Sequence, residues 1–344
     1  MERRTVLKAS LVAPAALTGS ALAPAPADAR PRLGGTLATG LDYPWGVDFL
    51  ADGSALVGER NSGRVLRVRR GGGATVVGVV PDVHNDGGEG GLMGIAVSPT
   101  FHHDRWVYFF LTTPSDNRIV RIRYVDGRLS GAPHPVLTGI PSGSTHNGGG
   151  LWFTKYPSLF ATTGDTRNSA LAQSKTSLAG KVLRMKPDGR AQRGNPFGNR
   201  VYSFGHRNIE GVTVDASGRL WASELGENTW DELNRIFPGR NYGWPRVEGT
   251  DGAGGHRDPL VQWHPADCSP SGVTTMHGRA WVGALRGECL WSVDIDGRGL
   301  RRKTRYFHGT FGRIRNVKRA PDGSLWLTTS NGGGTDKVLR VTFG

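Results

Sequence analysis

A single histidine lies in a polar, glycine-rich stretch of the sequence, residues 144–150 (Ser-Thr-His-Asn-Gly-Gly-Gly). Histidine is the side chain that most readily gains and loses a proton near neutral pH, so His146 suits the role of a general base. The glycines permit positive φ angles and let a ligand approach the backbone closely. A strand-like segment, residues 151–153, follows directly. Taken alone, the stretch also fits a turn histidine that has no chemistry.

Charged side chains stand in other glycine-containing loops as well. Glu89 lies within residues 86–94, and Arg207 precedes an asparagine, Asn208. Arg313 and Arg315 are two residues apart, so both fall on one face of a strand. Guanidinium groups pair with carboxylates through two parallel hydrogen bonds. Arginines that converge would therefore suit a ligand with several carboxylates, whereas any single arginine is equally a solvated surface charge.

The elements that position these loops are indicated by a sequence repeat. An aliphatic residue, any residue, usually arginine and a second aliphatic residue recur at 65–68, 119–122, 182–185, 233–236, 290–293 and 338–341. A second strand-like run precedes each copy, at 55–57, 106–108, 159–161, 220–222, 280–282 and 325–327. Turns such as Asp52-Gly53 and Asp322-Gly323 suit hairpins. No stretch shows a convincing amphipathic helical pattern.

Six β units at intervals of roughly 50 residues are typical of a β-propeller. The repeat therefore predicts an all-β, six-bladed β-propeller whose blades are four-stranded antiparallel sheets. We expect the last strand, residues 337–343, to close the ring beside an N-terminal strand near residues 35–40. The alternatives are a β-sandwich or two small β domains. In a propeller, loops from all blades meet at one end of the central channel, which would bring His146, Glu89 and the arginines together.

The N-terminal residues 1–29 are interpreted as an export signal. Arg3-Arg4 is followed by an alanine-rich apolar run and by Ala27-Asp28-Ala29, a small-x-small cleavage site. The paired arginines favour the twin-arginine route, and an ordinary secretory signal is the alternative. The propeller domain would then span residues 30–344, outside the cytoplasm. No later run reaches about 18 apolar residues, so no membrane span is expected.

The chain is strongly basic, with a net charge of +14 at pH 7. Such a surface attracts nucleic acid or a smaller anion. The cations are scattered and no nucleic-acid-binding motif is present, which favours a small anionic cofactor. The two cysteines, Cys268 and Cys289, could form a disulfide in an exported protein or remain as two buried thiols, and the disulfide is the favoured prediction.

Several short motifs, in order and at blade spacing, resemble the soluble pyrroloquinoline quinone (PQQ) dependent sugar dehydrogenases, a family of six-bladed propellers that includes glucose and aldose dehydrogenases. The resemblance covers nearly all of residues 30–344. Its motifs are Pro44-Trp45-Gly46, residues 88–92 (GEGGL), 178–184 (LAGKVLR), 205–208 (GHRN), 231–234 (DELN), 241–245 (NYGWP) and 312–315 (GRIR).

The resemblance implies site residues around PQQ. His146 matches the base that removes the proton of the substrate hydroxyl while a hydride moves to the quinone C5. The positions that match or face the cofactor are Glu89, Arg207, Asn208, Arg286, Arg313 and Arg315. Two calcium sites are implied as well. The carbonyls of Gly226 and Glu227 would bind Ca²⁺ together with the quinone, and Glu232 and Tyr242 resemble ligands of a further, structural Ca²⁺.

Four positions depart from the family pattern. Glu89 stands where the glucose enzymes carry glutamine, and a carboxylate facing an anionic cofactor needs an arginine partner or a proton. Thr145 replaces an aspartate found in some members, Gly150 replaces a larger residue, and Glu227 replaces a common proline.

Three functions follow from these patterns. The favoured one is a PQQ- and Ca²⁺-dependent dehydrogenase that oxidises an aldose or related alcohol. The others are a propeller that binds a carbohydrate or a protein without catalysis and a metal-dependent lactonase. The arginines in the predicted channel loops disfavour the lactonase. No haem motif of the Cys-x-x-Cys-His type is present, so a dehydrogenase would need an external electron acceptor.

Overall fold

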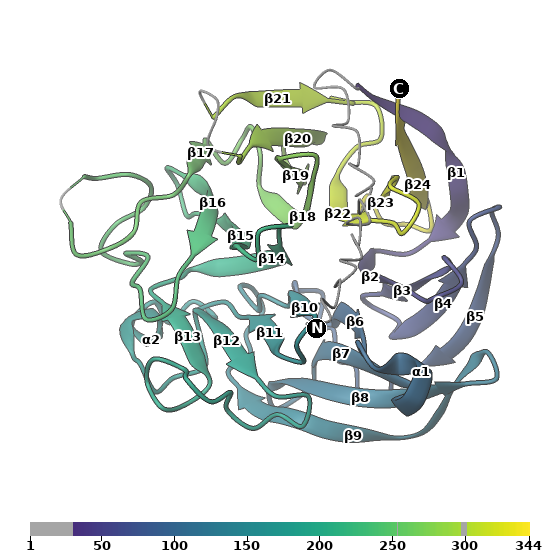
Figure 1. Ribbon diagram of the computed structural model, residues 1–344, viewed down its shortest axis with the longest axis horizontal. Coiled ribbons are helices and arrows are strands. Elements are labelled where there is room, and N and C mark those ends of the chain that lie inside the picture. The colour runs from purple at the N-terminus through teal and green to yellow at the C-terminus, as the bar shows by residue number, and fades with distance from the viewer. Residues whose placement is uncertain (1–29, 253, 297–300) are drawn as a thin grey trace, which may run out of the picture.

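Short apolar runs separated by turn residues fold this chain into a ring of six small sheets (Figure 1). The computed structural model describes residues 30–252, 254–296 and 301–344. Each sheet has four antiparallel strands, and strands that follow one another in sequence pair within a blade. The predicted six-bladed propeller is confirmed, and the sandwich and two-domain alternatives are excluded.

The blades follow one another around the ring in chain order. The first three contain β2 (Pro44–Phe49), β3 (Ala55–Glu59), β4 (Arg64–Val68) and β5 (Ala74–Val79); β6 (Leu92–Val97), β7 (Trp106–Thr112), β8 (Asn117–Val125) and β9 (Arg128–Ile140); and β10 (Leu151–Phe153), β11 (Leu159–Thr162), β12 (Lys181–Met185) and β13 (Val201–Phe204). The last three contain β14 (Asn208–Val214), β15 (Leu220–Leu225), β16 (Asp231–Ile236) and β17 (Val261–Trp263); β18 (Pro270–Met276), β19 (Arg279–Ala284), β20 (Cys289–Asp294) and β21 (Lys303–Tyr306); and β22 (Ile314–Arg319), β23 (Leu325–Thr329) and β24 (Asp336–Phe343) with β1 (Pro31–Leu41).

The two repeated runs of the sequence are the second and third strands of every blade. The second strands are β3, β7, β11, β15, β19 and β23, and the third strands are β4, β8, β12, β16, β20 and β24. The two helices, α1 (Phe101–Asp104) and α2 (Ala170–Gln173), are single turns. No helix among the described residues is long and apolar enough to cross a membrane.

The ring is closed by the pairing of the two ends of the described chain. β1 pairs antiparallel with β24, so that Arg32 lies opposite Thr342 and Ala38 opposite Val338. Figure 1 shows the purple β1 beside the yellow β24. This is the closure predicted from the sequence, and it completes the sixth blade with a strand from the N-terminal end of the described chain.

Apolar side chains gather between blades rather than in one central core. Among the described residues, each neighbouring pair of blades shares one cluster of buried side chains. At the closing interface, Leu37 and Leu41 of β1 and Trp326 of β23 pack with Val57 and Leu66 of the first blade. Full burial of each such side chain stabilises the fold by about 1.5–3 kcal/mol, so the ring is held by its blade interfaces.

The first strand of each blade lines the central channel, and these strands approach one another closely. Four of them carry glycine at the same place, Gly46, Gly94, Gly211 and Gly272, and in the third blade the equivalent Gly150 directly precedes β10. A Cβ on Gly94 would lie 2.1 Å from the carbonyl oxygen of Gly149, so no side chain fits there. The sixth blade has Asn316 instead, and its Nδ2 donates to the carbonyl of Trp45 at 2.7 Å.

The side chains that precede these glycines close the channel. Arg315 Nη1 lies 2.5 Å from Glu210 Oε2, and the hydroxyl of Ser271 donates to the same oxygen at 2.6 Å. The cavity that remains on the axis has a volume of about 30 Å³. Arg315, one of the arginines predicted to bind the cofactor, is thereby linked to the fourth and fifth blades.

The two cysteines are the exception to the sequence-based expectation. Cys268 and Cys289 lie in the same buried cluster between the fourth and fifth blades, and both are free thiols. Burial raises the pKa of both thiols, to about 12 for Cys289. The disulfide favoured from the sequence is therefore wrong for this structure, and the alternative of two buried thiols holds.

Candidate active site

The loop between β9 and β10 holds His146 in an unusual backbone conformation. Its φ is 57°, in the left-handed region, and its N–H donates to Glu89 Oε2 at 2.8 Å. Gly164 must be glycine, because a Cβ there would lie 2.0 Å from the carbonyl oxygen of His146. Backbone strain of this kind persists only where the surroundings impose it, and it gathers at functional sites.

The ring of His146 is oriented by a carboxylate that the sequence analysis missed. Nδ1 lies 2.8 Å from Asp165 Oδ1, and Asp165 is almost fully buried. The other carboxylate oxygen accepts the indole N–H of Trp244 at 2.8 Å. Burial acts to raise the pKa of Asp165, but hydrogen bonds from His146, the Arg167 amide and Trp244 outweigh it and hold the pKa below its usual value.

A charged Asp165 places the proton of a neutral His146 on Nδ1. Nε2 makes no hydrogen bond among the described residues, so its lone pair is free to accept a proton. This is the arrangement of a general base whose tautomer is set by a carboxylate. The turn at Asp165 is strained too, since Thr166 and Arg167 have φ values of 52° and 64°. These φ values distinguish the turn in the structure, whereas no motif or residue pattern in the sequence indicated it.

The sequence departures beside His146 have local explanations. The hydroxyl of Thr145 accepts a hydrogen bond from Arg167 Nε at 2.9 Å, so it ties the base loop to the Asp165 turn. A Cβ on Gly150 would lie 2.6 Å from Thr162 Oγ1 and 2.9 Å from the carbonyl oxygen of Glu210. This channel position therefore accepts no larger residue.

Arg207 and Asn208 lie next to the loop of His146 and the turn of Asp165. Asn208 Oδ1 accepts the N–H of Gly148 at 2.9 Å, and the Asp165 N–H donates to the Arg207 carbonyl at 2.7 Å. The Arg207 guanidinium lies 5.5 Å from the ring centre of Trp244, and its Nε is buried without a partner. Arg207, directly before β14, thus holds a buried donor without a partner close to the loop of His146.

At the channel mouth, the charge of Arg315 acts on two further arginines, Arg313 and Arg60. Arg315 has an unpartnered, buried Nε although its Nη1 meets Glu210. Burial and the charge of Arg315 both lower the pKa of Arg313 and of Arg60, and Glu210 opposes this. Arg60 was not predicted, because an arginine after a strand carries no signal of its own. Arg286 is exposed and forms no ion pair among the residues described.

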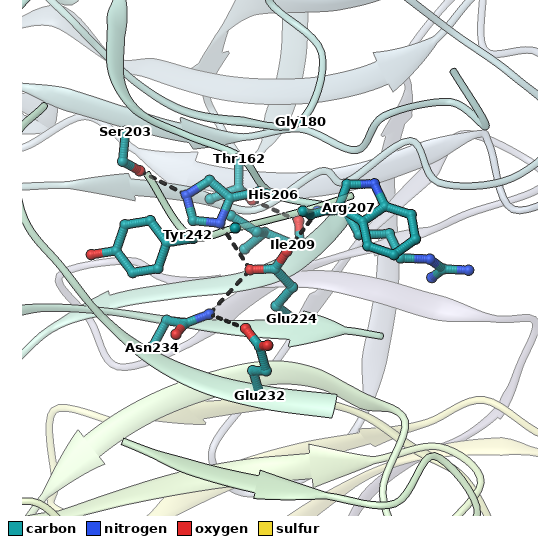
Figure 2. Close-up of polar contacts among 12 residues, drawn as sticks. Thr162, Gly180, Ser203, His206, Arg207, Ile209, Glu224, Glu232, Asn234 and Tyr242 are labelled. Carbon is teal, nitrogen blue, oxygen red and sulfur yellow. Dashed lines mark hydrogen bonds and ion pairs between the residues drawn. The ribbon is translucent and has the colours of Figure 1, made fainter. Parts of the chain in front are cut away.

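Three of the four predicted calcium residues line a small cavity near Arg207, and Glu227 does not. Gly226, Glu232 and Tyr242 line it together with two carboxylates that the sequence analysis missed, Glu224 and Glu248. Asn234 Nδ2 bridges Glu224 and Glu232 at 3.1 and 2.8 Å. Figure 2 shows this chain of contacts continuing from Glu224 through His206 to Ser203.

The side chains of two predicted metal residues, Tyr242 and Glu227, do not point towards a metal site. The Tyr242 hydroxyl donates to the Arg235 carbonyl at 2.7 Å and points away from Glu224 and Glu232 in Figure 2. Glu227 is exposed, and its amide is one of four, from residues 227–230, that donate to Glu248 Oε1 at 2.5–3.2 Å. Any metal contact of Tyr242 would therefore use its carbonyl oxygen.

The charge at this cavity fits a hard cation. Burial and the nearby Glu224 raise the pKa of Glu232 to about 8. Two buried carboxylates side by side are costly unless a proton or a cation neutralises them. The available donors are oxygens, which Ca²⁺ prefers. Among the described residues, the closest His and Asp grouping lies elsewhere, at Asp251, His256 and Asp258, and it is largely exposed.

A buried ammonium group braces the backbone behind the base. Lys181 is fully buried, and its Nζ donates to the carbonyls of Leu171, Ala172 and Ala179 at 2.6–2.9 Å. The neighbouring Gly180 N–H donates to Gly164, next to Asp165. Lys181 therefore holds α2 against the turn that orients His146.

Lys181→Met is expected to lower the free energy of unfolding by about 3 kcal/mol, because several buried carbonyls lose their donor. Urea denaturation followed by tryptophan fluorescence measures this change. Lys155→Met, at an exposed position in the same blade, is the control. An equal effect of both substitutions would contradict the bracing role.

Comparison with known proteins identifies the family. A family model described as Glucose / Sorbosone dehydrogenase matches residues 41–340. The chain belongs to the glucose/sorbosone dehydrogenase family. The match covers all six blades, so the resemblance predicted from short motifs is confirmed.

Individual members of the glucose/sorbosone dehydrogenase family are similar over most of the chain. The PQQ-bound aldose sugar dehydrogenase structure from Streptomyces coelicolor is 44% identical, with a TM-score of 0.88 over 93% of this chain and 99% of that one. The aldose sugar dehydrogenase YliI of Escherichia coli is 28% identical over 88% of this chain and 90% of its own length. The quinoprotein glucose dehydrogenase B of Acinetobacter calcoaceticus is 30% identical over 61% of this chain and 51% of its own length.

Proposed function

We propose that this protein is a PQQ- and Ca²⁺-dependent dehydrogenase that oxidises an aldose or a related alcohol. The observation that carries the proposal is the His146–Asp165 pair, which hydrogen bonds tie to the neighbouring Arg207 and Asn208. The PQQ-bound relative and the quinoprotein relative support the choice of cofactor. A base alone does not oxidise an alcohol, so a two-electron acceptor is needed, and this is what PQQ supplies when bound.

The residues present fit an anionic, flat cofactor. Arg313, Arg315 and Arg60 provide more positive charge than Glu210 neutralises, and the buried Nε atoms of Arg207 and Arg315 lack partners. Carboxylates of a cofactor would satisfy these donors. Gly226 and Glu227 would supply carbonyl oxygens to a Ca²⁺ ion, and Glu232 with Tyr242 would hold a second one.

The protein's own groups would act on the substrate hydroxyl. His146 Nε2 accepts the hydroxyl proton as the C–H hydride leaves, and Asp165 stabilises the imidazolium that forms. The hydroxyl thereby becomes a carbonyl, which for an aldose C1 is a lactone. The sugar thus loses a hydride and a proton, that is two electrons and two hydrogen nuclei, and the two electrons go to the acceptor.

Reconstitution of the apo protein tests the proposal. PQQ with Ca²⁺ should change the quinone absorbance on binding, and aldoses should then reduce an added dye. Absence of PQQ binding at concentrations on the order of tens of micromolar would contradict the proposal. Binding of PQQ without turnover of any aldose or alcohol would favour the non-catalytic propeller.

Export and electron transfer belong to the same proposal. The predicted signal, residues 1–29, lies outside the described residues, and we propose that it directs the protein out of the cytoplasm. Electrons would then pass to an external acceptor.

A further inference from the structure

Arg60 stands at the end of β3 and reaches into the channel mouth from the first blade. Its guanidinium carbon lies 4.6 Å above the ring centre of Tyr43, and its Nε donates to Asn61 Oδ1 at 3.0 Å. A Cβ on Gly91 would lie 2.9 Å from Arg60 Cγ and 2.3 Å from its carbonyl oxygen. Only glycine at position 91, in the Glu89 loop, leaves room for Arg60 in this position.

The surroundings of Arg60 and Arg313 overlap although they belong to different blades. Burial comes first in lowering the pKa of each guanidinium, and the positive charge of Arg315 adds to it. Glu210 and Tyr43 act on both in the opposite direction. The contacts agree with this: the Arg315 guanidinium carbon lies 6.0 Å from the ring centre of Trp45, two residues after Tyr43. The Arg313 N–H donates to Asn331, whose neighbour Gly332 lies against the Tyr43 hydroxyl. Arg60, Arg313 and Arg315 therefore form one cluster around Tyr43 and Trp45.

The three guanidinium groups of this cluster carry more positive charge than the neighbouring carboxylates neutralise. Among the described residues, Arg315 has the ion pair with Glu210, whereas Arg60 and Arg313 have none. Glu89 acts on Arg60 at longer range, and its Oε2 already accepts the N–H of His146. Like charges held together and partly buried cost stability, and such costs gather where a ligand of opposite charge binds.

We propose that Arg60 is a further cofactor-binding residue, which completes with Arg313 and Arg315 a cradle of three cations for the carboxylates of the bound cofactor. Arg60 also brings a positive charge towards Glu89. It thereby links the cradle to the loop of the base. The proposal rests on the proposed function, since it takes the anion to be PQQ.

The test measures PQQ affinity in the full-length apo protein with saturating Ca²⁺, by quenching of tryptophan fluorescence. Arg60→Gln should raise the Kd for PQQ about tenfold or more, because a charge-assisted contact is lost. Arg60→Lys should fall between Arg60→Gln and the wild type, because it keeps the charge but loses the fork. Arg69→Gln, at an exposed position in the same blade, should leave the Kd unchanged.

Thermal unfolding of the apo variants separates a binding role from a structural one. Removal of one of three repelling charges should leave the Tm of apo Arg60→Gln unchanged or slightly higher. A fall in its apo Tm of more than about 5 °C would show that Arg60 is structural and overturn the proposal. A Kd within about twofold of the wild type would overturn it as well. If the wild type itself fails to bind PQQ, the proposed function fails with it.

Discussion

His146→Gln should reduce kcat for aldose oxidation about 10³-fold while leaving PQQ affinity within about twofold of the wild type. The substitution removes Nε2 as a proton acceptor, and His146 contacts no arginine of the cradle. Dye-coupled assays at saturating PQQ and Ca²⁺ measure the rate, and fluorescence quenching measures the affinity. His84→Gln, at an exposed position in the chain leading to the Glu89 loop, is the matched control.

Asp165→Asn tests the same unit from the other side. An asparagine amide at this position can donate to Nδ1, which would move the proton of the ring to Nε2 and remove the lone pair that faces the substrate. We therefore expect a loss of similar size, and little further loss when both substitutions are combined. A His146→Gln variant that keeps more than about a tenth of the wild-type kcat would rule out His146 as the base.

The apo protein should become less stable as the pH rises from about 5 to about 8. Glu232 has its pKa raised from 4.5 to about 8 in the folded protein, so the folded state holds a proton that the unfolded state has lost across this window. Stability is therefore greatest below the unfolded pKa and falls as the pH rises towards the folded one, by a loss on the order of 3 kcal/mol. Thermal unfolding in chelator across this pH range measures the trend.

Calcium should reverse that trend. At pH 8 the ion takes the place of the proton, so added Ca²⁺ should raise the Tm, and this gain should shrink towards pH 5. Glu232→Gln imitates the protonated acid and should flatten the apo pH profile and abolish the part of the Ca²⁺ response that comes from this site. Glu227→Gln, whose side chain is exposed, should behave as the wild type. A flat wild-type profile in chelator would disprove the protonated state of Glu232.

The sequence was informative where the evidence is local and repeated. Two short runs per blade predicted the second and third strands, because alternation and turn residues act within a few positions of one another. The closure of β1 on β24 followed from counting blades. His146, Arg207, Asn208, Arg313 and Arg315 were predicted from motifs as site residues, and the ring brings their loops towards one end of the channel.

The residues that were missed act through partners distant in sequence. Asp165 meets His146 across 19 positions, in a turn that resembles many others. Arg60 joins the cluster because the missing Cβ of Gly91 leaves room for its side chain and because its guanidinium stacks over the Tyr43 ring. Glu248 reaches the Glu232 cavity from the long connection between β16 and β17, whose course no local pattern determines. The expected disulfide failed because cysteine spacing says nothing of bonding.

The contacts of Glu210 with Arg315 and Ser271 close the central channel. The cavity left on the axis has a volume of about 30 Å³, so it is too small for a sugar molecule to pass from one face of the ring to the other. If the protein is the dehydrogenase proposed above, sugar and electron acceptor would reach the cofactor from the same face and would bind in turn. An excess of either would then slow the half-reaction of the other.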